Sequence, residues 1–190
     1  GFGGKKPYHQ AATNHGRENK NTMKKHRNLM LKYGSMMGGV SIALTLLQHQ
    51  LQAYNGAPLT IFAFGILPIL FLTFFIFLGI YLSKERSFRQ MIKIGLGISI
   101  LFAIIAGVFW VIFIQYIDPN HLDRVNHLQL EAYQKQFPSA DPQSIAQMQQ
   151  DMERNKLPWI QFNLSVVSNM FFGLVISLLG SSFFKIFNRT

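Results

Sequence analysis

Four residues with metal-binding side chains lie close together in a polar stretch of the sequence. They are Asp118, His121, Asp123 and His127. Carboxylates and imidazoles are the side chains that Zn²⁺ and related divalent metals use as ligands. On a helix, residues three or four positions apart share a face, so Asp118 pairs with His121 and Asp123 with His127. The two pairs point in different directions, which argues against one four-ligand shell. We therefore assign no metal ligand, and helix capping with surface solvation is the simpler interpretation.

No other group of residues in the sequence indicates catalysis. The chain has no cysteine, which excludes disulfides, thiolate chemistry and cysteine-based metal sites. It also lacks an HExxH motif, a P-loop, a Ser-His-Asp arrangement and a pair of buried carboxylates. Asn163 and Asn169 are polar residues within an apolar segment, and we interpret them as hydrogen-bonding groups between helices. The sequence predicts no catalytic residue, no cofactor and no enzymatic activity.

Four long apolar segments must position any site that the chain has. They cover approximately residues 29–51, 59–82, 91–117 and 159–187, and the second contains no charged residue. A hydrocarbon core of about 30 Å is crossed by a helix of roughly 20 apolar residues, in which every backbone polar group is satisfied. The sequence therefore predicts an all-α integral membrane protein in which residues 29–190 form a domain with four transmembrane helices.

Residues 118–158 form the one long connection, between the third and fourth segments. Asp118-Pro119 and Asp141-Pro142 each resemble a helix N-cap followed by proline at the first helical position. Apolar residues at helical spacing follow both pairs, which predicts a small extracytoplasmic helical hairpin with one apolar side. Acidic residues outnumber basic ones here, which argues against a membrane surface as its cover and favours either a partner protein or folding back on the helix ends. Met148 and Met152 are the predicted partner-binding residues, because flexible thioether side chains fill irregular gaps.

The net charge of +10 follows the apolar segments and does not indicate nucleic-acid binding. Basic residues gather before the first segment, between the second and third, and after the fourth, and this pattern predicts that both termini are cytoplasmic. Residues 1–28 are a basic polar tail, which we expect to be disordered without a partner. Met23 is followed by Lys24-Lys25-His26-Arg27 and resembles a translation start. Residues 1–22 are then either native chain or an added extension, and the sequence leaves both open.

Small residues recur at every fourth position in three of the four segments. In lipid, helices associate by close backbone approach and van der Waals contact, which such stripes permit. We therefore predict that the first, third and fourth helices meet closely, whereas the second, rich in Phe and containing Pro68, faces lipid or a partner. The alternative is that Gly and Ser are simply common in membrane helices. The predicted packing residues are Gly34, Ser35, Gly38, Gly39, Gly95, Ser99, Ala103, Gly107, Gly173, Ser177 and Ser181.

From Lys32 to its C-terminus the chain resembles a family of small four-helix inner-membrane proteins. The resemblance rests on Leu31-Lys32-Tyr33-Gly34, on residues 87–97 (SFRQMIKIGLG) and on residues 117–122 (IDPNHL). This family is common in Bacteroidota and is known only as a domain of unknown function. The resemblance implies a bacterial inner (cytoplasmic) membrane location and offers no activity.

Two functions remain open from the sequence. The first is a non-catalytic accessory or scaffold subunit of a bacterial inner-membrane protein complex, whose partners would be the lipid bilayer and other membrane subunits. It is favoured by the packing stripes and by the absence of ionisable residues from the middle of the apolar segments, since transporters usually carry such residues. The alternative is a transporter or channel component that acts as a homo-oligomer.

Overall fold

The protein is all-α and multi-pass. The computed structural model describes residues 8–53 and 58–187, with side chains for residues 22–53 and 62–187. Four helices in these ranges are long and apolar enough to cross a membrane: Thr22–Gln50, Phe62–Ser83, Phe88–Ile117 and Pro158–Phe187. No strand occurs within the described ranges.

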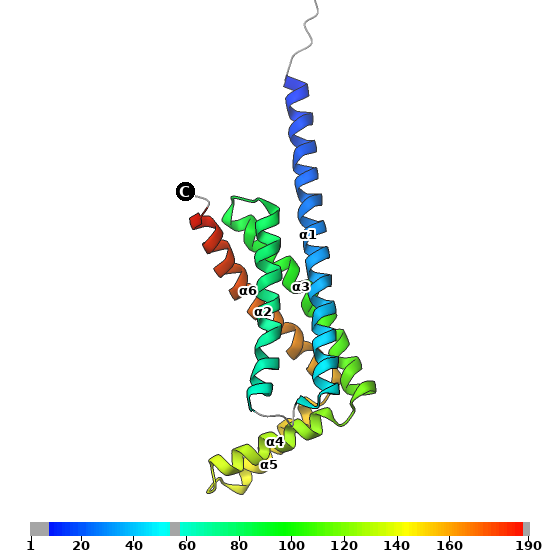
Figure 1. Cartoon of the computed structure of the whole chain (residues 1–190), viewed down its shortest axis with the longest axis vertical. Helices are drawn as coiled ribbons and strands as arrows, with labels where there is room; N and C mark the ends of the chain where they lie inside the picture. The colour runs from blue at the N-terminus through cyan, green and yellow to red at the C-terminus, as the bar shows by residue number, and fades with distance from the viewer. Residues whose placement is uncertain (1–7, 54–57, 188–190) are drawn as a thin grey trace, which may run out of the picture.

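The helices form a bundle with a long extension at one end and two short helices across the other (Figure 1). α1 extends well beyond the bundle at its N-terminal end, and α4 with α5 lies across the opposite end. In chain order the elements are α1 (Tyr8–Gln50), α2 (Pro58–Ser83), α3 (Phe88–Ile112), the π-helix η2 (Phe113–Ile117), α4 (His121–Gln136), α5 (Pro142–Asn155) and α6 (Pro158–Phe187).

The polar segment before the first apolar stretch is helical. α1 already begins at Tyr8, so the prediction of a disordered tail over residues 1–28 is wrong from Tyr8 onward. Helix propagation adds a hydrogen bond for each residue fixed, so a helix started in the apolar stretch extends at little cost. Lys25 and His26 also contact the turn between α2 and α3, which holds this part of α1 in place.

α3 is the central helix of the bundle. It packs against α1 and against α6, and α2 contacts all three of these helices. The prediction that α2 faces lipid or a partner is wrong for one of its sides, because Leu72, Phe75, Ile76 and Ile80 are buried in the core. The other side of α2, which includes Phe74, is exposed. An apolar composition all round a helix does not show which of its sides will be covered by protein.

α3 and α6 run antiparallel, and each places a glycine against a serine of the other. A Cβ atom at Gly95 would overlap with Ser177, and one at Gly173 would overlap with Ser99. Both serines are fully buried, and each donates its hydroxyl to a carbonyl oxygen of its own helix, Ser99 to Gly95 and Ser177 to Gly173. The polar atoms are thus satisfied while the two backbones approach closely, as helix contact in lipid requires.

The contact between α3 and α6 continues in both directions beyond these two glycine–serine pairs. Ala103 is fully buried, and a Cβ at Gly107 would lie 3.0 Å from Val166 Cγ2. On α6, Ser181 is also fully buried. The residues Gly95, Ser99, Ala103 and Gly107 are all buried, on a single face of α3.

Only half of the small residues proposed for α1 face another helix of the chain. A Cβ at Gly34 would lie 2.9 Å from Leu101 Cβ, and one at Gly38 would lie 2.7 Å from Ile105 Cγ2, so both pack against α3. Ser35 and Gly39 are exposed, and a Cβ at Gly39 would meet no atom within 4 Å. A helix turns about 100° per residue, so residues next to a packed glycine point away from the contact.

We predict that large side chains at Ala103 or Gly107 separate α3 from α6. Ala103→Leu and Gly107→Leu should each destabilise the protein by about 1–3 kcal/mol, because the added atoms have no space. The measurement is thermal unfolding in detergent. Gly39→Leu, in open space, and Phe74→Leu, on the exposed side of α2, are the controls and should change stability much less. Equal stability of all four variants would contradict the close approach of the two helices.

Candidate functional site

A buried carboxylate lies where α1, η2 and α4 meet, at the end of the bundle next to α4. Asp118 is only 6% exposed. Its Oδ2 atom contacts the guanidinium of Arg124 and lies 3.3 Å from His49 Nδ1 and 3.4 Å from His121 Nδ1. We refer to Asp118, His49, His121 and Arg124 as the Asp118 cluster. It joins the C-terminal end of α1 to the start of α4.

A local widening of the helix precedes Asp118. The last turn after α3 is the π-helix Phe113–Ile117, in which the Asp118 N–H donates to the carbonyl oxygen of Phe113 at 2.8 Å. Such turns are rare and often occur at functional positions. The prediction that Asp118 caps the next helix is wrong, because the N-cap of α4 is Asn120. The Asp118 carboxylate instead accepts a hydrogen bond from Arg124.

Aromatic rings and an amide surround the Asp118 cluster. Phe113 is fully buried, and its ring centroid lies 5.5 Å from that of His49 and 5.4 Å from that of His121, both edge-on. The ring of Trp110 lies 5.3 Å from that of His121, and Trp110 Nε1 donates to Gln161 Oε1 at 2.9 Å. Gln161 Nε2 in turn donates to the carbonyl oxygen of residue 155 at 2.7 Å. These contacts tie the ends of α3, α5 and α6 to the same place.

The charges of the cluster are set by burial and by Arg124. Burial alone would raise the pKa of Asp118, but the hydrogen bond and charge of Arg124, with the two histidines, lower it below its usual value of 3.8. Burial lowers the pKa of His121 below 6.5 and outweighs the opposing effect of Asp118. At neutral pH Asp118 is therefore charged and His121 neutral. The unfolded chain protonates His121 more readily, so this histidine costs stability as the pH falls below about 6.5.

The arrangement is suited to holding helix ends and not to binding a metal. Arg124 occupies the carboxylate oxygen that both histidines face, and its charge repels a further cation. Among the residues with described side chains, no group of three or more His, Cys, Asp or Glu could hold a metal ion. Asp123 instead contacts Lys156, and His127 Nδ1 lies 3.4 Å from Glu131 Oε1. The four residues considered from the sequence are thus divided among three places.

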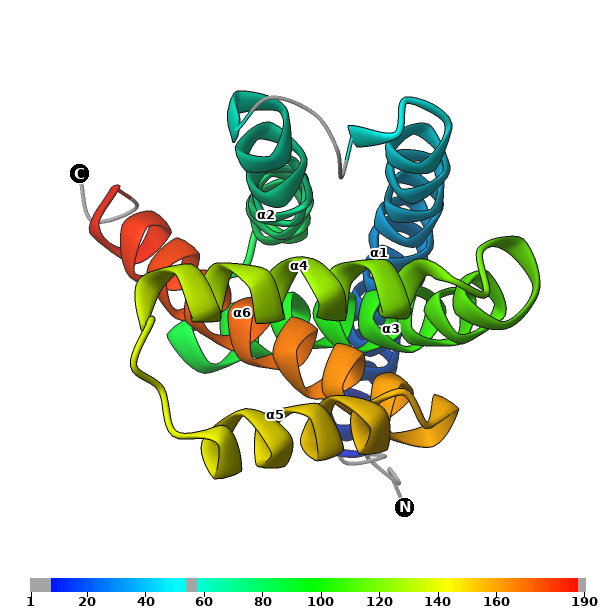
Figure 2. The same cartoon turned by 90° about the horizontal axis from the view of Figure 1, so that it is seen from below.

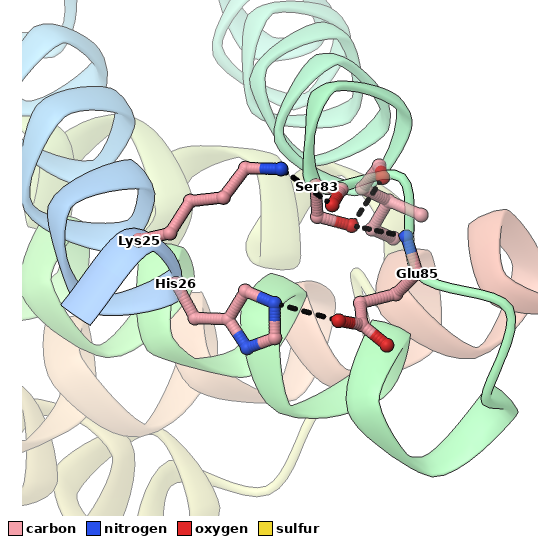
Figure 3. A network of polar contacts seen from close by, with 5 residues as sticks. Lys25, His26, Ser83 and Glu85 are labelled. Carbon is pink, nitrogen blue, oxygen red and sulfur yellow. Dashed lines mark hydrogen bonds and ion pairs between the residues drawn. The ribbon is translucent and has the colours of Figure 1, made fainter. Parts of the chain in front are cut away.

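A second polar cluster joins α1 to the turn between α2 and α3, at the opposite end of the bundle (Figure 3). Lys25 Nζ donates to the carbonyl oxygen of Ser83 at 3.0 Å, and His26 Nε2 lies 2.9 Å from Glu85 Oε1. The Ser83 hydroxyl donates to the Ile80 carbonyl oxygen at 2.6 Å and accepts from the Glu85 N–H at 3.2 Å. We refer to Lys25, His26, Ser83 and Glu85 as the turn cluster.

α4 and α5 touch each other little and run separately across the end of the bundle (Figure 2). Lys156, just after α5, contacts both Asp123 of α4 and Glu153 of α5, and so links the two helices. These two acidic partners, Asp123 and Glu153, also raise the pKa of Lys156. No residue of α5 is fully buried, and Met148 and Met152 are partly buried. The apolar row of α5 therefore receives little cover from α4.

Several residues in and around the Asp118 cluster were not predicted from the sequence. These residues belong to different segments, and their position near segment ends was the only sign in the sequence that they could meet: His49, Trp110, Arg124 and Gln161. Asn163 and Asn169 do not bond across helices as proposed. Asn169 Nδ2 is 3.4 Å from Ser165 Oγ of the same helix, and Asn163 lies on the exposed side of α6. Both amides can be satisfied without a second helix, so their presence within an apolar segment does not indicate a contact.

Residues 32–185 match the family model described as protein of unknown function, DUF4199. The chain belongs to this family. The match covers residues 32–50 of α1, the whole of α2, α3, α4 and α5, and α6 apart from its last two residues. The Asp118 cluster lies within the DUF4199 region, whereas Lys25 and His26 of the turn cluster lie before it. No curated protein and no solved structure matches the chain.

We predict that Asp118→Asn loosens the end of the bundle. The change removes the charged acceptor of Arg124 and should cost about 1.5–3 kcal/mol, the usual range for a hydrogen bond to a charged group. The measurement is thermal unfolding in detergent at neutral pH. Asp123→Asn is the matched control, since Asp123 is exposed and its ion pair with Lys156 should contribute below about 1 kcal/mol. Equal loss of stability in both variants would show that burial of the Asp118 cluster has no energetic consequence.

Proposed function

We propose that the protein is a non-catalytic accessory or scaffold subunit of a bacterial inner-membrane protein complex. The observation that carries this proposal is the apolar row of α5, which the chain covers only in part. Ile145, Met148 and Met152 lie three and four positions apart and share one side of the helix, yet none of them is buried. Two short helices that touch little cannot cover such a row by pairing alone.

The chemistry of α4 and α5 supports a protein as the cover. Helices that lie on a membrane usually carry Lys and Arg on their polar side, to meet anionic headgroups. These two helices carry four acidic and three basic residues, and Asp123 and Glu153 both face Lys156. Methionine side chains adapt to irregular surfaces, which suits the docking of another subunit. The polar clusters at both ends of the bundle would keep the docking helices at a fixed position.

The proposed orientation places α4 and α5 outside the cytoplasm and both termini inside. Lys84, Arg86 and Arg89 follow α2 or begin α3 at one end of the bundle, with Lys185 at the end of α6. Basic residues at the ends of membrane helices favour the cytoplasmic side, which orients the whole bundle. α4 and α5 then face the periplasm, where a partner would meet them.

The orientation predicts the accessibility of single cysteines, since the chain has none of its own. A cysteine at Gln143, at the start of α5, should react with an impermeant maleimide added to intact spheroplasts. One at Ser87, in the turn between α2 and α3, should react only after lysis. Both positions are exposed, so a difference in labelling reports the side of the membrane and not burial. Labelling of Ser87 from outside would reverse the orientation.

The docking proposal predicts that charge on the apolar row of α5 releases a partner. Met148→Glu with Met152→Glu should leave membrane insertion and thermal stability unchanged but lower the yield of co-purifying subunits in mild detergent. The control is Gln147→Glu with Gln150→Glu, which adds the same charge to exposed positions on the opposite side of the helix. Retention of every partner by the methionine variant would exclude α5 as the docking surface. Purification of a lone homo-oligomer would favour the alternative, a transporter or channel component.

A further inference from the structure

A cavity of about 650 Å³ lies between the end of α2 and the end of α6. Its walls are apolar and aromatic, with Tyr81 and Leu82 on α2 and Phe183, Phe184 and Phe187 on α6. Lys84 and Arg86, in the turn that follows α2, line the same cavity. Glu85, between them in the sequence, also lines it. One cavity therefore combines a long apolar wall with two basic residues and one acidic residue at one side.

The two basic residues of this cavity form no ion pair with the side chains that the structure describes. Neither Lys84 nor Arg86 has a carboxylate within 4.0 Å among the side chains that the structure describes. Glu85 lies between them in the sequence, but its carboxylate is directed to His26 at 2.9 Å (Figure 3). An anion that enters the cavity would therefore meet two unpaired cations, while the one acidic residue of the lining, Glu85, is paired with His26.

The backbone of Lys84 is held in an unfavourable conformation. Its φ is 58°, in the left-handed region that residues after a helix usually reach with glycine. Such a conformation persists only where the surrounding structure holds it, and Gln52, after α1, has a similar φ of 46°. Glycine here would relieve the strain but would remove the charge from the cavity.

The cavity also lies at the depth of the lipid headgroups. Ser83 is the last residue of one membrane-spanning helix and Phe187 of another, so Lys84 and Arg86 lie just beyond the apolar spans. The aromatic wall extends from this level along the ends of both spans. Phosphates of a bilayer lie at the same level, and juxtamembrane basic residues attract anionic headgroups.

We propose that this cavity binds a phospholipid with an anionic headgroup. The phosphate contacts Lys84 and Arg86, and an acyl chain lies along Leu82 and the phenyl rings of α6. The charge selects the headgroup, and the apolar wall distinguishes a lipid from a soluble phosphate. This site depends neither on the orientation of the bundle nor on the proposed subunit function.

The test is native mass spectrometry of the full-length protein in detergent, with phosphatidylglycerol or phosphatidylcholine of the same acyl chains. The wild type should retain phosphatidylglycerol in preference to phosphatidylcholine. Lys84→Asn combined with Arg86→Gln should weaken phosphatidylglycerol binding roughly 30-fold, because each basic residue near the surface contributes about a fivefold factor. Asparagine tolerates the left-handed conformation at this position, so the variant should fold. Unchanged thermal unfolding without added lipid verifies the fold.

The matched control is Arg89→Gln with Lys93→Gln. These exposed residues lie in the first turns of α3, at the same end of the bundle, and do not line the cavity. The control should bind phosphatidylglycerol within about twofold of the wild type. Equal retention of the two lipids, or equal loss in both double variants, would overturn the proposal. Displacement of the lipid by glycerol phosphate or inorganic phosphate would also overturn it, since the site would then bind a soluble phosphate.

Discussion

The close approach of α3 and α6 is the constraint on which the rest of the bundle depends. Lipid tails are as apolar as the helix surfaces, so no hydrophobic gain drives the contact, and dispersion acts only over short distances. Gly95 and Gly173 remove the side chains that would separate the backbones, and Ser177 and Ser99 fill the spaces left. Because the hydroxyls of Ser99 and Ser177 are bonded within their own helices, neither of these two serines needs a polar partner on the other helix. α1 can then pack on another side of α3, through Gly34 and Gly38.

The sequence was sufficient for the spans and insufficient for the contacts between them. Segment length and apolar composition identify membrane helices, because the bilayer imposes both. The buried side of α2 could not be predicted, since its residues are apolar all round and only the neighbouring helices decide what is covered. The same difficulty applies to α1, where small residues occur in adjacent pairs and so lie on two faces of the helix. Gly34 and Gly38 pack against α3, whereas Ser35 and Gly39 are exposed.

The polar clusters were harder still to predict, because they join residues far apart in the chain. His49 and Asp118 meet only after α1 and α3 have packed, and the π-helix that precedes Asp118 has no distinctive sequence. His26 and Glu85 are similarly separated, and the first belongs to a segment whose composition is typical of a disordered tail. The spacing of acids and histidines within residues 118–127 drew attention to local pairs, whereas the actual partners of Asp118 include a residue of another helix.

The two clusters are also separated by a distance that fits the membrane. His26 and His49 lie on the same uninterrupted helix, and at 1.5 Å per residue they are about 35 Å apart along its axis. A hydrocarbon core is about 30 Å thick, so each cluster falls near one membrane surface when α1 stands close to the membrane normal. Charged groups there avoid the full cost of burial in lipid and remain partly shielded from water, which strengthens their contacts. α1 is therefore fixed at both surfaces, to the turn after α2 at one and to the start of α4 at the other. A bundle held in this way can present α4 and α5 on one side of the membrane and the basic cavity on the other as fixed surfaces.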